Sequence, residues 1–443
     1  MRHIPWAFLA GLASMLWAVS PLSAQSIEYV IHVSVDGLRP DAVTTQTPAQ
    51  LPNFYRLRNE GAFTDNARCD VDFMKTLQNH IDMMTGRGVY GPIGASHEWD
   101  VNAWTPGDTL ESNKGSYIAG VYGVAHDNGL RTGLYTGKEK FGVFDESWNA
   151  INGAPDVTGP DNGRDKLDQY VCNENTLMLT LTWSAQNTST PQNYSFLHLS
   201  DPDWVGHEFG WMSEEYLDSV RDVDGYLGFV FDLAENNLVM AGKTAIIVTA
   251  DHGGHDFTHG DLIPEDFTVP LMVWGPGVPA GDDLYAMNPT SRQDPGTVMP
   301  TWTATTQPIR NSDTPNLALS LLGLGPIPGS AINDAQDLNV FPSIPGDANY
   351  DGVVNETDAR VLGSHWRDTP GSAVWSHGDF NGDRTVNAAD ASIMAANWGQ
   401  GTTETDTIAV PEPNTMTFLV SISLLGLFAS RRPSIFWRRQ LPR

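Results

Sequence analysis

The sequence predicts an α/β fold in which helices cover both faces of a mostly parallel central sheet. Dense β-branched apolar runs at residues 27–35, 194–199 and 243–249 are typical of strands buried on both faces of such a sheet. An amphipathic helical segment that begins at Ser213 provides a matching apolar face. Acidic residues and histidines directly follow the strand-like runs, which is where the binding sites of open α/β sheets form.

The composition allows a large core and an appended module, because 40% of the 443 residues are hydrophobic. There are 53 acidic and 25 basic residues, and the formal net charge is −28. This balance argues against binding of a nucleic-acid polymer through a basic surface. The only cysteines, Cys69 and Cys172, exclude a disulfide framework. They form either one bridge or, as we expect, two buried free thiols.

Residues 1–24 are typical of a secretory signal peptide. Arg2 and His3 precede an apolar stretch through Val19, and the small residues Ser23 and Ala24 precede the expected cleavage point. A membrane anchor is the competing interpretation, but the apolar stretch is short and no stop-transfer pattern follows it. We therefore expect an exported protein.

The first strand, expected at 27–35, ends at Asp36. A helix is expected at 52–59, closed by Gly61 in the C′ position. An acid that follows a strand is commonly a helix cap, so these residues alone do not assign Asp36 a function.

A second helix is expected from Lys75 and Thr76 toward Met84, which places the Thr76 hydroxyl at a positive helix terminus. Backbone amides at such a terminus can hold a phosphate oxygen. The plain structural interpretation of Thr76 is an N-cap.

Residues 90–161 are rich in Gly, Asn, Asp and Trp and contain a short expected strand at 131–136. We interpret this segment as an insertion that shapes the substrate pocket. Its tryptophans Trp99, Trp104 and Trp148 could stack on an aromatic substrate, although core packing is the favoured interpretation.

The expected strand 194–199 leads into DPDWVGH, where Asp203 and His207 are four residues apart and could face one ion from a single turn. His198 and Asp201 are close enough in sequence to compete for that role.

The expected strand 243–249 leads into ADHGGHDFTHGD, which contains the adjacent pair Asp251 and His252. His255 and His259 both remain as candidates for a last ligand. A strand at 269–274 and an apolar helix at 314–324 close the predicted catalytic domain, residues 25–331, and a linker is expected at 332–345.

The ordered motifs resemble the type I phosphodiesterase and nucleotide pyrophosphatase family of the alkaline phosphatase superfamily. They are the strand VIHVSVDGLRPDAV, KT-x-x-NH at 75–80, Thr85-Gly86, P-D-x-x-G-H at 202–207, DHGG at 251–254 and the helix TPNLALSLLGL. The resemblance covers about residues 27–330. It departs from the family at Gln78, where a proline is usual.

The resemblance implies that Thr76 is the nucleophile and that the Asn79 amide stabilises a nonbridging phosphoryl oxygen. It implies two divalent ions, zinc in this family, one held by Asp36, Thr76, Asp251 and His252. The second would be held by Asp203, His207 and His259, so that His259 is favoured over His255.

The expected activity is hydrolysis of small phosphoric esters, whether diesters, nucleotide pyrophosphates or monoesters, through a covalent phosphothreonine. The alternatives are an inactive surface binding or assembly protein, and sulfatase or phosphonate chemistry on the same fold. A sulfatase is disfavoured because its C-x-P-x-R or S-x-P-x-R motif is absent.

Residues 346–400 contain two acidic loops, each followed by a helical run, at a 32-residue offset. They resemble a type I dockerin, a small helical module with EF-hand-like loops, and imply Ca²⁺ and a cohesin-like or surface-matrix partner. Arg384 stands where the second loop favours glycine. The expected calcium ligands are Asp347, Asn349, Asp351, Asn355 and Asp358 in the first loop, and Asp379, Asn381, Asp383, Asn387 and Asp390 in the second.

Residues 401–443 contain Pro411, Glu412 and Pro413, then an apolar run from Met416 to Ala429 and a basic cluster. This tail resembles the PEP-CTERM sorting signal of bacterial exported proteins. It implies a sorting protease as a partner and a periplasmic, cell-surface or extracellular location, with transient anchoring through the tail. A permanent anchor is the competing interpretation.

Overall fold

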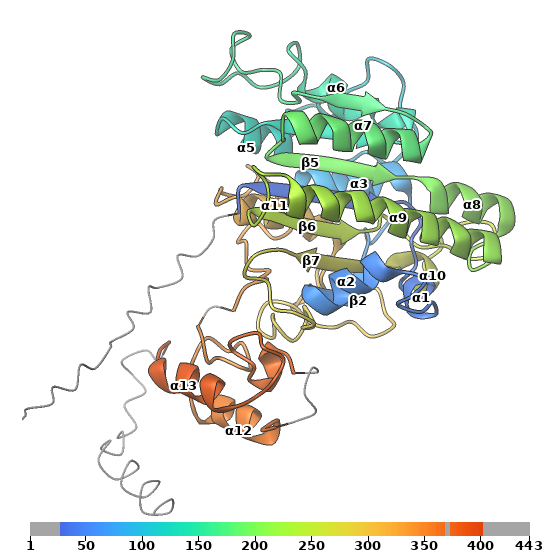
Figure 1. Cartoon of the computed structure of the whole chain (residues 1–443). Helices are drawn as coiled ribbons and strands as arrows, with labels where there is room; N and C mark the ends of the chain where they lie inside the picture. The colour runs from blue at the N-terminus through green and yellow to red at the C-terminus, as the bar shows by residue number, and fades with distance from the viewer. Residues whose placement is uncertain (1–26, 343, 368–372, 402–443) are drawn as a thin grey trace, which may run out of the picture. The chain divides into compact units, whose positions relative to one another are not determined.

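The computed structural model describes residues 27–342, 344–367 and 373–401 (Figure 1). The expected signal peptide and nearly all of the expected sorting tail lie outside these residues. No helix in the described part of the chain is long and apolar enough to cross a membrane.

The core of the main unit is a seven-stranded sheet in the order β2-β7-β6-β1-β5-β3-β4. β1 lies in its middle and pairs in parallel with both β5 and β6. β3 continues the parallel arrangement with β5 and β4, whereas β7 is antiparallel to β6 and β2. The predicted α/β class with a mostly parallel sheet is therefore confirmed. The strands are β1 Tyr29–Val35, β2 Ala62–Arg68, β3 Thr132–Thr136, β4 Tyr170–Cys172, β5 Tyr194–Leu199, β6 Thr244–Thr249 and β7 Thr268–Trp274.

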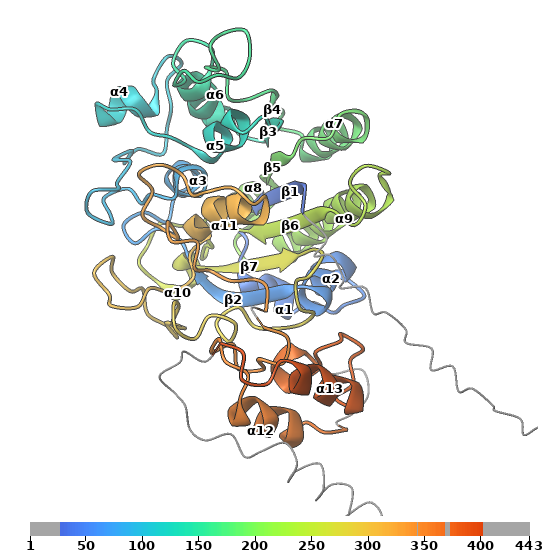
Figure 2. The same ribbon diagram turned by 90° about the vertical axis from the view of Figure 1, so that its left-hand side faces the viewer.

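Two layers of helices cover the sheet (Figure 2). One layer contains α1 Pro40–Thr44, α2 Pro52–Glu60, α7 Thr176–Ser189 and α9 Glu214–Asn236. The other contains α3 Thr76–Thr85, α5 Val121–Asp127 and α11 Thr314–Leu321. The remaining elements of this unit are α4 Leu110–Lys114, η1 Glu139–Phe141, α6 Gly142–Trp148, α8 Asp201–Phe209, α10 Pro264–Phe267 and η2 Asn311–Asp313.

The strands that the sequence predicts are those buried on both faces. β1, β5 and β6 have no exposed residue, in agreement with their continuous apolar runs. β2 and β4, the two edge strands, were not predicted. Polar residues interrupt the apolar pattern of β2, and β4 has only three residues.

One local expectation is wrong. Gly61 ends α2 with φ −127°, which is extended backbone and not the left-handed C′ conformation. A Cβ at Gly61 would overlap the Val273 carbonyl oxygen, so the glycine is needed for the close approach of β7. Within the expected linker 332–345, Leu338 and Val340 are buried against the main hydrophobic core.

The three tryptophans of segment 90–161 pack within the protein, as the favoured interpretation predicted, and the two cysteines are free. Trp99 and Trp148 are buried in the core, and Trp104 packs against Gly142. Cys69 and Cys172 are both free thiols, as expected, but only Cys69 is buried.

The calcium module consists of α12 Glu356–Ser364, η3 Trp375–His377 and α13 Ala388–Ala396 around a small core of its own. Its two halves repeat the same hydrogen bonds. The Asp358 carboxylate accepts from the backbone N–H groups of Ala348 and Asn355, and the Asp390 carboxylate accepts from Phe380 and Asn387.

Candidate active site

The predicted site residues meet at one edge of the sheet, beyond the carboxyl ends of adjacent strands. Asp36 follows β1, and Asp251 and His252 follow β6 after a single residue. Asp203 and His207 lie on α8, which begins two residues after β5 ends. Because β6, β1 and β5 are neighbours in the sheet, residues more than two hundred positions apart converge there.

The side chains form two groups of three donors, each with its donor atoms within 4.8 Å of one another. In the first group, His252 Nε2 lies 3.6 Å from Asp36 Oδ1 and 3.2 Å from Asp251 Oδ2. In the second group, Asp203 Oδ1 lies 3.4 Å from His207 Nε2 and 3.7 Å from His259 Nε2. The His252 and His259 rings stack at 3.6 Å, so the two groups adjoin.

The donor atoms have the chemistry of a cation site. Asp36 Oδ1, Asp203 Oδ1 and Asp251 Oδ2 are buried and accept no hydrogen bond among the described residues. An uncompensated buried carboxylate oxygen is costly, and a bound cation removes that cost. These residues therefore fit the two divalent ions that the sequence implies.

The three histidines are oriented in the same way. The Nδ1–H groups of His207, His252 and His259 can donate to the carbonyl oxygens of Phe257, Gly253 and Met74, at 3.0, 2.7 and 2.7 Å. This leaves each Nε2 atom for the cation, the usual arrangement of a metal-binding histidine. His255 instead bonds to Asp266 at 2.8 Å and is not a member of either group.

The ionisation of the buried groups agrees with this chemistry. Burial lowers the pKa of His252 and of His259, so both rings are neutral near pH 7 and each offers a lone pair. Burial raises the pKa of Asp251, and the charge of Asp36 adds to that shift. Burial opposes the charge of Asp36 too, but attraction to Lys138 and a hydrogen bond from His198 outweigh it and lower the pKa of Asp36.

Thr76 is the first residue of α3 and lies at the base of an open pocket of about 350 Å³. Its Oγ1 is 3.5 Å from His252 Nε2, and only 1% of the residue is exposed. The N-cap position belongs to Lys75, whose Nζ donates to the His259 carbonyl oxygen at 2.7 Å. The pocket is lined by Thr76, Asn102, Gly137, Lys138, Glu139, Lys140, Glu174, Asp203, Trp204, His207 and His259.

The expected role of Asn79 is not supported by its position. Its amide donates to the carbonyl oxygens of Phe73 and Lys75, at 2.7 and 3.0 Å, and its Oδ1 accepts from the backbone of Asp70 at 2.7 Å. Asn79 is fully buried and does not line the pocket. Both the NH₂ group and the Oδ1 atom of Asn79 therefore bond to the backbone around the start of α3. The expectation that this amide faces the substrate is corrected.

The sequence analysis missed most of the other pocket residues, and three of them bear on the chemistry. Asn102 reaches the N-terminus of α3, where its Oδ1 accepts from Leu77 N at 3.0 Å. Lys138 lies at the end of β3, and Trp204, which is 53% exposed, lies between the predicted ligands Asp203 and His207. The position of Trp204 inside the P-D-x-x-G-H motif was the one sequence signal that could have identified it.

Trp211 packs the two ligand-bearing loops together. Its ring occupies the space that a Cβ would need at Gly206 of α8 and at Gly254 after β6, and its Nε1 donates to the Gly37 carbonyl at 2.9 Å. These two glycines therefore permit the close approach that places His207 beside His259.

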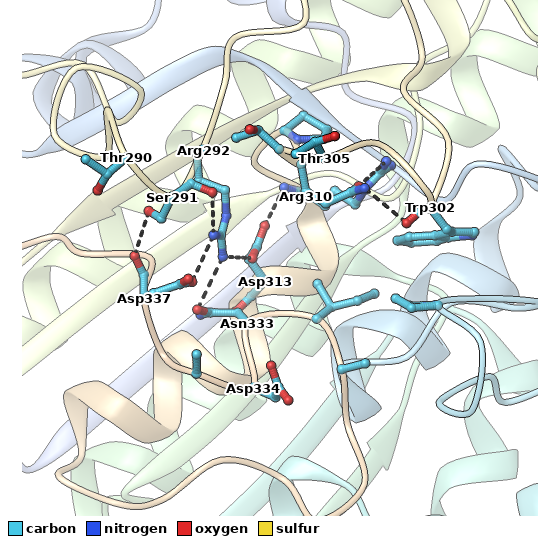
Figure 3. A pocket seen from close by; sticks show the side chains of 17 residues that line it. Thr290, Ser291, Arg292, Trp302, Thr305, Arg310, Asp313, Asn333, Asp334 and Asp337 are labelled. Atoms are coloured by element: carbon cyan, nitrogen blue, oxygen red, sulfur yellow. Dashed lines mark hydrogen bonds and ion pairs between the residues drawn. The ribbon is translucent and has the colours of Figure 1, made fainter.

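A second cavity, of about 320 Å³, shares no lining residue with the catalytic pocket (Figure 3). Arg292 donates to Asp313 and Asp337, both at 2.8 Å. Arg310 donates to the Pro300 carbonyl at 2.8 Å and lies 4.4 Å from the centre of the Trp302 ring. Since protein groups already pair both guanidinium groups, we assign this cavity no ligand.

Comparison with known families supports two of the predicted modules. Residues 133–300 match the family model described as type I phosphodiesterase / nucleotide pyrophosphatase, and residues 345–399 match that of the dockerin type I domain. The predicted resemblance to both families is therefore confirmed. The first match includes both ligand-bearing motifs after β5 and β6, and the second includes both acidic loops.

Shorter stretches are similar to curated proteins. GPI ethanolamine phosphate transferase 1 of Neurospora crassa is 42% identical over 91 residues, which cover 20% of this chain and 9% of that protein. The Saccharomyces cerevisiae protein of the same name is 38% identical over 113 residues, or 25% and 12%. The chain thus spans about a tenth of the length of these relatives. Among solved structures, murine ectonucleotide pyrophosphatase / phosphodiesterase 5 in complex with AMP shows 15% identity and a TM-score of 0.47, covering 70% of this chain and 99% of that one.

Proposed function

We propose that this chain is a metal-dependent hydrolase of phosphoric esters in which Thr76 is the nucleophile. One observation carries the proposal. Thr76 lines a pocket together with Asp203, His207 and His259, and its Oγ1 lies 3.5 Å from His252 of the other donor group. Each carboxylate of the two groups has one buried oxygen without a hydrogen bond among the described residues.

The donor groups would hold two divalent ions, most suitably zinc for mixed histidine and carboxylate ligands. Asp36, Asp251 and His252 would hold one ion together with Thr76, and Asp203, His207 and His259 would hold the other. When bound, such ions lower the pKa of a neighbouring hydroxyl and offset charge on a phosphoryl group.

The chain's own residues supply the covalent chemistry. The Thr76 hydroxyl gives up its proton as its oxygen bonds to phosphorus, and the bond from phosphorus to the leaving oxygen breaks as that oxygen takes up one proton, so the number of protons is unchanged. Water then attacks the phosphothreonine and the Thr76 O–P bond breaks. One proton of the water restores the Thr76 hydroxyl, and its oxygen leaves in the released phosphate or phosphomonoester. The positive end of α3 favours the phosphoryl charge throughout.

Asn102 is the side chain best placed to donate to a phosphoryl oxygen, the role expected of Asn79. Its Oδ1 is used by Leu77 N and by Lys140 Nζ, at 3.0 and 2.9 Å, which orients the carboxamide at the pocket. Its NH₂ group then remains for the substrate. Trp204 offers an exposed ring beside the same pocket for an apolar or aromatic ester group.

The test is a Thr76→Ala variant compared with Thr76→Ser and wild type. We expect Thr76→Ala to lose at least about a thousandfold in kcat, because no covalent intermediate can form, while the far-ultraviolet circular dichroism stays unchanged. The substrates are p-nitrophenyl phosphate, bis-p-nitrophenyl phosphate, a nucleotide pyrophosphate and an aryl sulfate, each with and without a chelator. Wild-type rates in Thr76→Ala would show that Thr76 is not the nucleophile. If the wild-type protein hydrolysed only the aryl sulfate, it would be a sulfatase and not a phosphoric ester hydrolase.

A second candidate function is transfer of the phosphoryl group to an alcohol instead of water. The observation in its favour is the 42% identity to an ethanolamine phosphate transferase over 91 residues. Both reactions use the same phosphothreonine and differ only in the acceptor. Product analysis with ethanolamine or glycerol present distinguishes them, because a transferase gives a new phosphoester and a hydrolase gives the water product.

We also propose that the chain acts outside the cytoplasm. The signal-like residues 1–24 and the PEP-CTERM-like tail support export and sorting by a protease. The dockerin match supports docking to a cohesin-like or surface-matrix protein. A protein that only binds at the surface, without activity, would keep this location but give no turnover of any substrate in the panel.

A further inference from the structure

Lys138 connects the two donor groups of the active site. Its Nζ lies 2.6 Å from Asp36 Oδ2 and 2.5 Å from Asp203 Oδ2. These are not the carboxylate oxygens that approach the histidines, since His252 lies near Asp36 Oδ1, and His207 and His259 lie near Asp203 Oδ1. Each carboxylate therefore presents one oxygen to the cation position and the other to Lys138.

The fold holds this lysine firmly in place. The residue is 8% exposed, and its backbone N–H donates to Thr136 Oγ1 at 3.1 Å, at the end of β3. A Cβ at Gly137 would overlap the Ser200 hydroxyl, so only glycine allows the chain to pass this close to β5. The Lys138 Nζ lies 5.4 Å from the centre of the Trp204 ring, which borders the same pocket.

We propose that Lys138 is a positioning residue that couples the two metal centres: its ammonium joins a ligand carboxylate of one centre to a ligand carboxylate of the other. The proposal rests on the metal-dependent function proposed above. A group that hydrogen-bonds to a metal ligand on the side away from the ion typically raises the metal affinity about 10- to 100-fold. Lys138 does so for both centres at once, and it thereby sets their separation around Thr76.

Lys140 provides a matched control two residues away. It lines the same pocket, but its Nζ donates to Asn102 Oδ1 at 2.9 Å and contacts none of the metal-ligand carboxylates. Lys138→Met and Lys140→Met each replace a lysine by an unbranched neutral side chain that is one heavy atom shorter. Any difference in metal binding between them therefore reports the carboxylate contacts.

The experiment titrates metal-free protein with Zn²⁺ against a chromophoric chelator and, separately, records electron paramagnetic resonance after loading with Mn²⁺. With the two acidic loops of the dockerin-like module filled by excess Ca²⁺, we expect wild type and Lys140→Met to bind two further ions that give the spectrum of a coupled pair. Lys138→Met should bind at least one ion about 10- to 100-fold more weakly and lose the coupled spectrum.

Restoring an ammonium group at position 138 should restore binding of the coupled pair of metal ions. In a Cys69→Ala, Cys172→Ser background, unfolded Lys138→Cys protein is divided and alkylated with bromoethylamine, which rebuilds a lysine-like ammonium, or with iodoacetamide, which leaves a neutral side chain. The first product should regain both affinity and coupling, and the second should not. Both derivatives start from the same protein and are refolded in parallel, so this comparison replaces Lys138→Met if that variant does not fold.

The outcomes separate the two proposals. A wild-type chain that binds no pair of ions overturns the proposed function, and this inference with it. A wild type that binds the pair while Lys138→Met, or the neutral derivative, binds it with the same affinity and coupling overturns the inference alone.

Discussion

At the scale of single residues, three buried carboxylates make the candidate site suitable for cations. Asp36, Asp203 and Asp251 are almost fully buried, and each has one oxygen without a hydrogen bond among the described residues. Such an arrangement costs free energy unless cations complete it. The donor set is therefore best explained by binding of ions, and Lys138 neutralises only the opposite side of two of the carboxylates.

Lys140 should make substrate binding sensitive to pH. Burial, with the nearby Lys138 charge, lowers the pKa of Lys140 to about 8. Its ammonium is positive below that pH and neutral above it, so the attraction for an anionic ester weakens as pH rises. We expect the KM of wild type to increase as pH passes through about 8, and the KM of Lys140→Met to lack this step. An identical KM profile in both proteins would show that Lys140 does not contact the substrate.

Arg384 carries backbone strain in the second calcium loop. Its φ is +62°, whereas the equivalent residue of the first loop is Gly352 with φ +83°. The backbone N–H groups of both donate to the first aspartate of their loop, Asp379 and Asp347, at 2.6 and 2.8 Å. A side chain in this conformation costs about 1 kcal/mol, which glycine avoids.

Replacement of that arginine by glycine should therefore strengthen the second site. We expect Arg384→Gly to raise its Ca²⁺ affinity about fivefold, measured by isothermal titration calorimetry. Arg384→Ala is the control, because it removes the charge but keeps a Cβ. Equal gains in both variants would assign the effect to charge and not to backbone conformation.

At the scale of elements, the N-terminus of α2 is capped from a distant helix. The Asp224 carboxylate of α9 accepts from the backbone N–H groups of Asn53 and Phe54, at 2.9 and 2.8 Å. These are among the N–H groups that a helix leaves without partners in its first turn. The cap therefore joins α2 to α9 and also satisfies the first turn of α2.

Loss of the Asp224 carboxylate should destabilise the packing of α2 against α9. We expect Asp224→Ala to reduce the free energy of unfolding by about 2 kcal/mol, because buried N–H groups lose their acceptor. The midpoint of thermal unfolding of the catalytic unit is the measurement. Asp222→Ala, at an exposed position of the same helix, is the control and should leave the midpoint nearly unchanged.

At the scale of the whole molecule, the chain combines an α/β unit, for which we propose a metal-dependent chemistry, with a module that matches the dockerin type I domain. The module's own core contains only a few apolar side chains, among them Val354, Leu362 and Val386. A core this small supplies little stability by itself, so bound Ca²⁺ should supply much of the rest.

Addition of Ca²⁺ to calcium-free protein should slow amide hydrogen exchange across α12 and α13 and leave the central sheet unaffected. The same concentration of Mg²⁺ should have little effect, because these loops offer the larger oxygen cage that Ca²⁺ prefers. An Asp347→Asn, Asp379→Asn double variant should lose the response. Exchange that does not depend on Ca²⁺ would show that the module is stable without its ions.

The sequence by itself determined the elements whose signals are local and continuous. The β-branched runs of β1, β5 and β6 predict buried strands because both faces of the sheet demand apolar residues. The motifs that follow them carry Asp36, Asp203 and Asp251, so the candidate ligands could be predicted together with the strands. The edge strands β2 and β4 could not be predicted, since polar residues interrupt β2 and β4 is only three residues long.

Only the tertiary structure decided which of the remaining side chains reach the site. Asn79 lies in the strongest motif, yet its amide is used by the backbone, whereas Asn102 reaches the pocket from a loop without any motif. Lys138 is unremarkable in sequence and contacts Asp36 and Asp203 only because β3, β5 and β1 are neighbours. Strand order is set by packing between distant segments, and no local pattern along the chain records it.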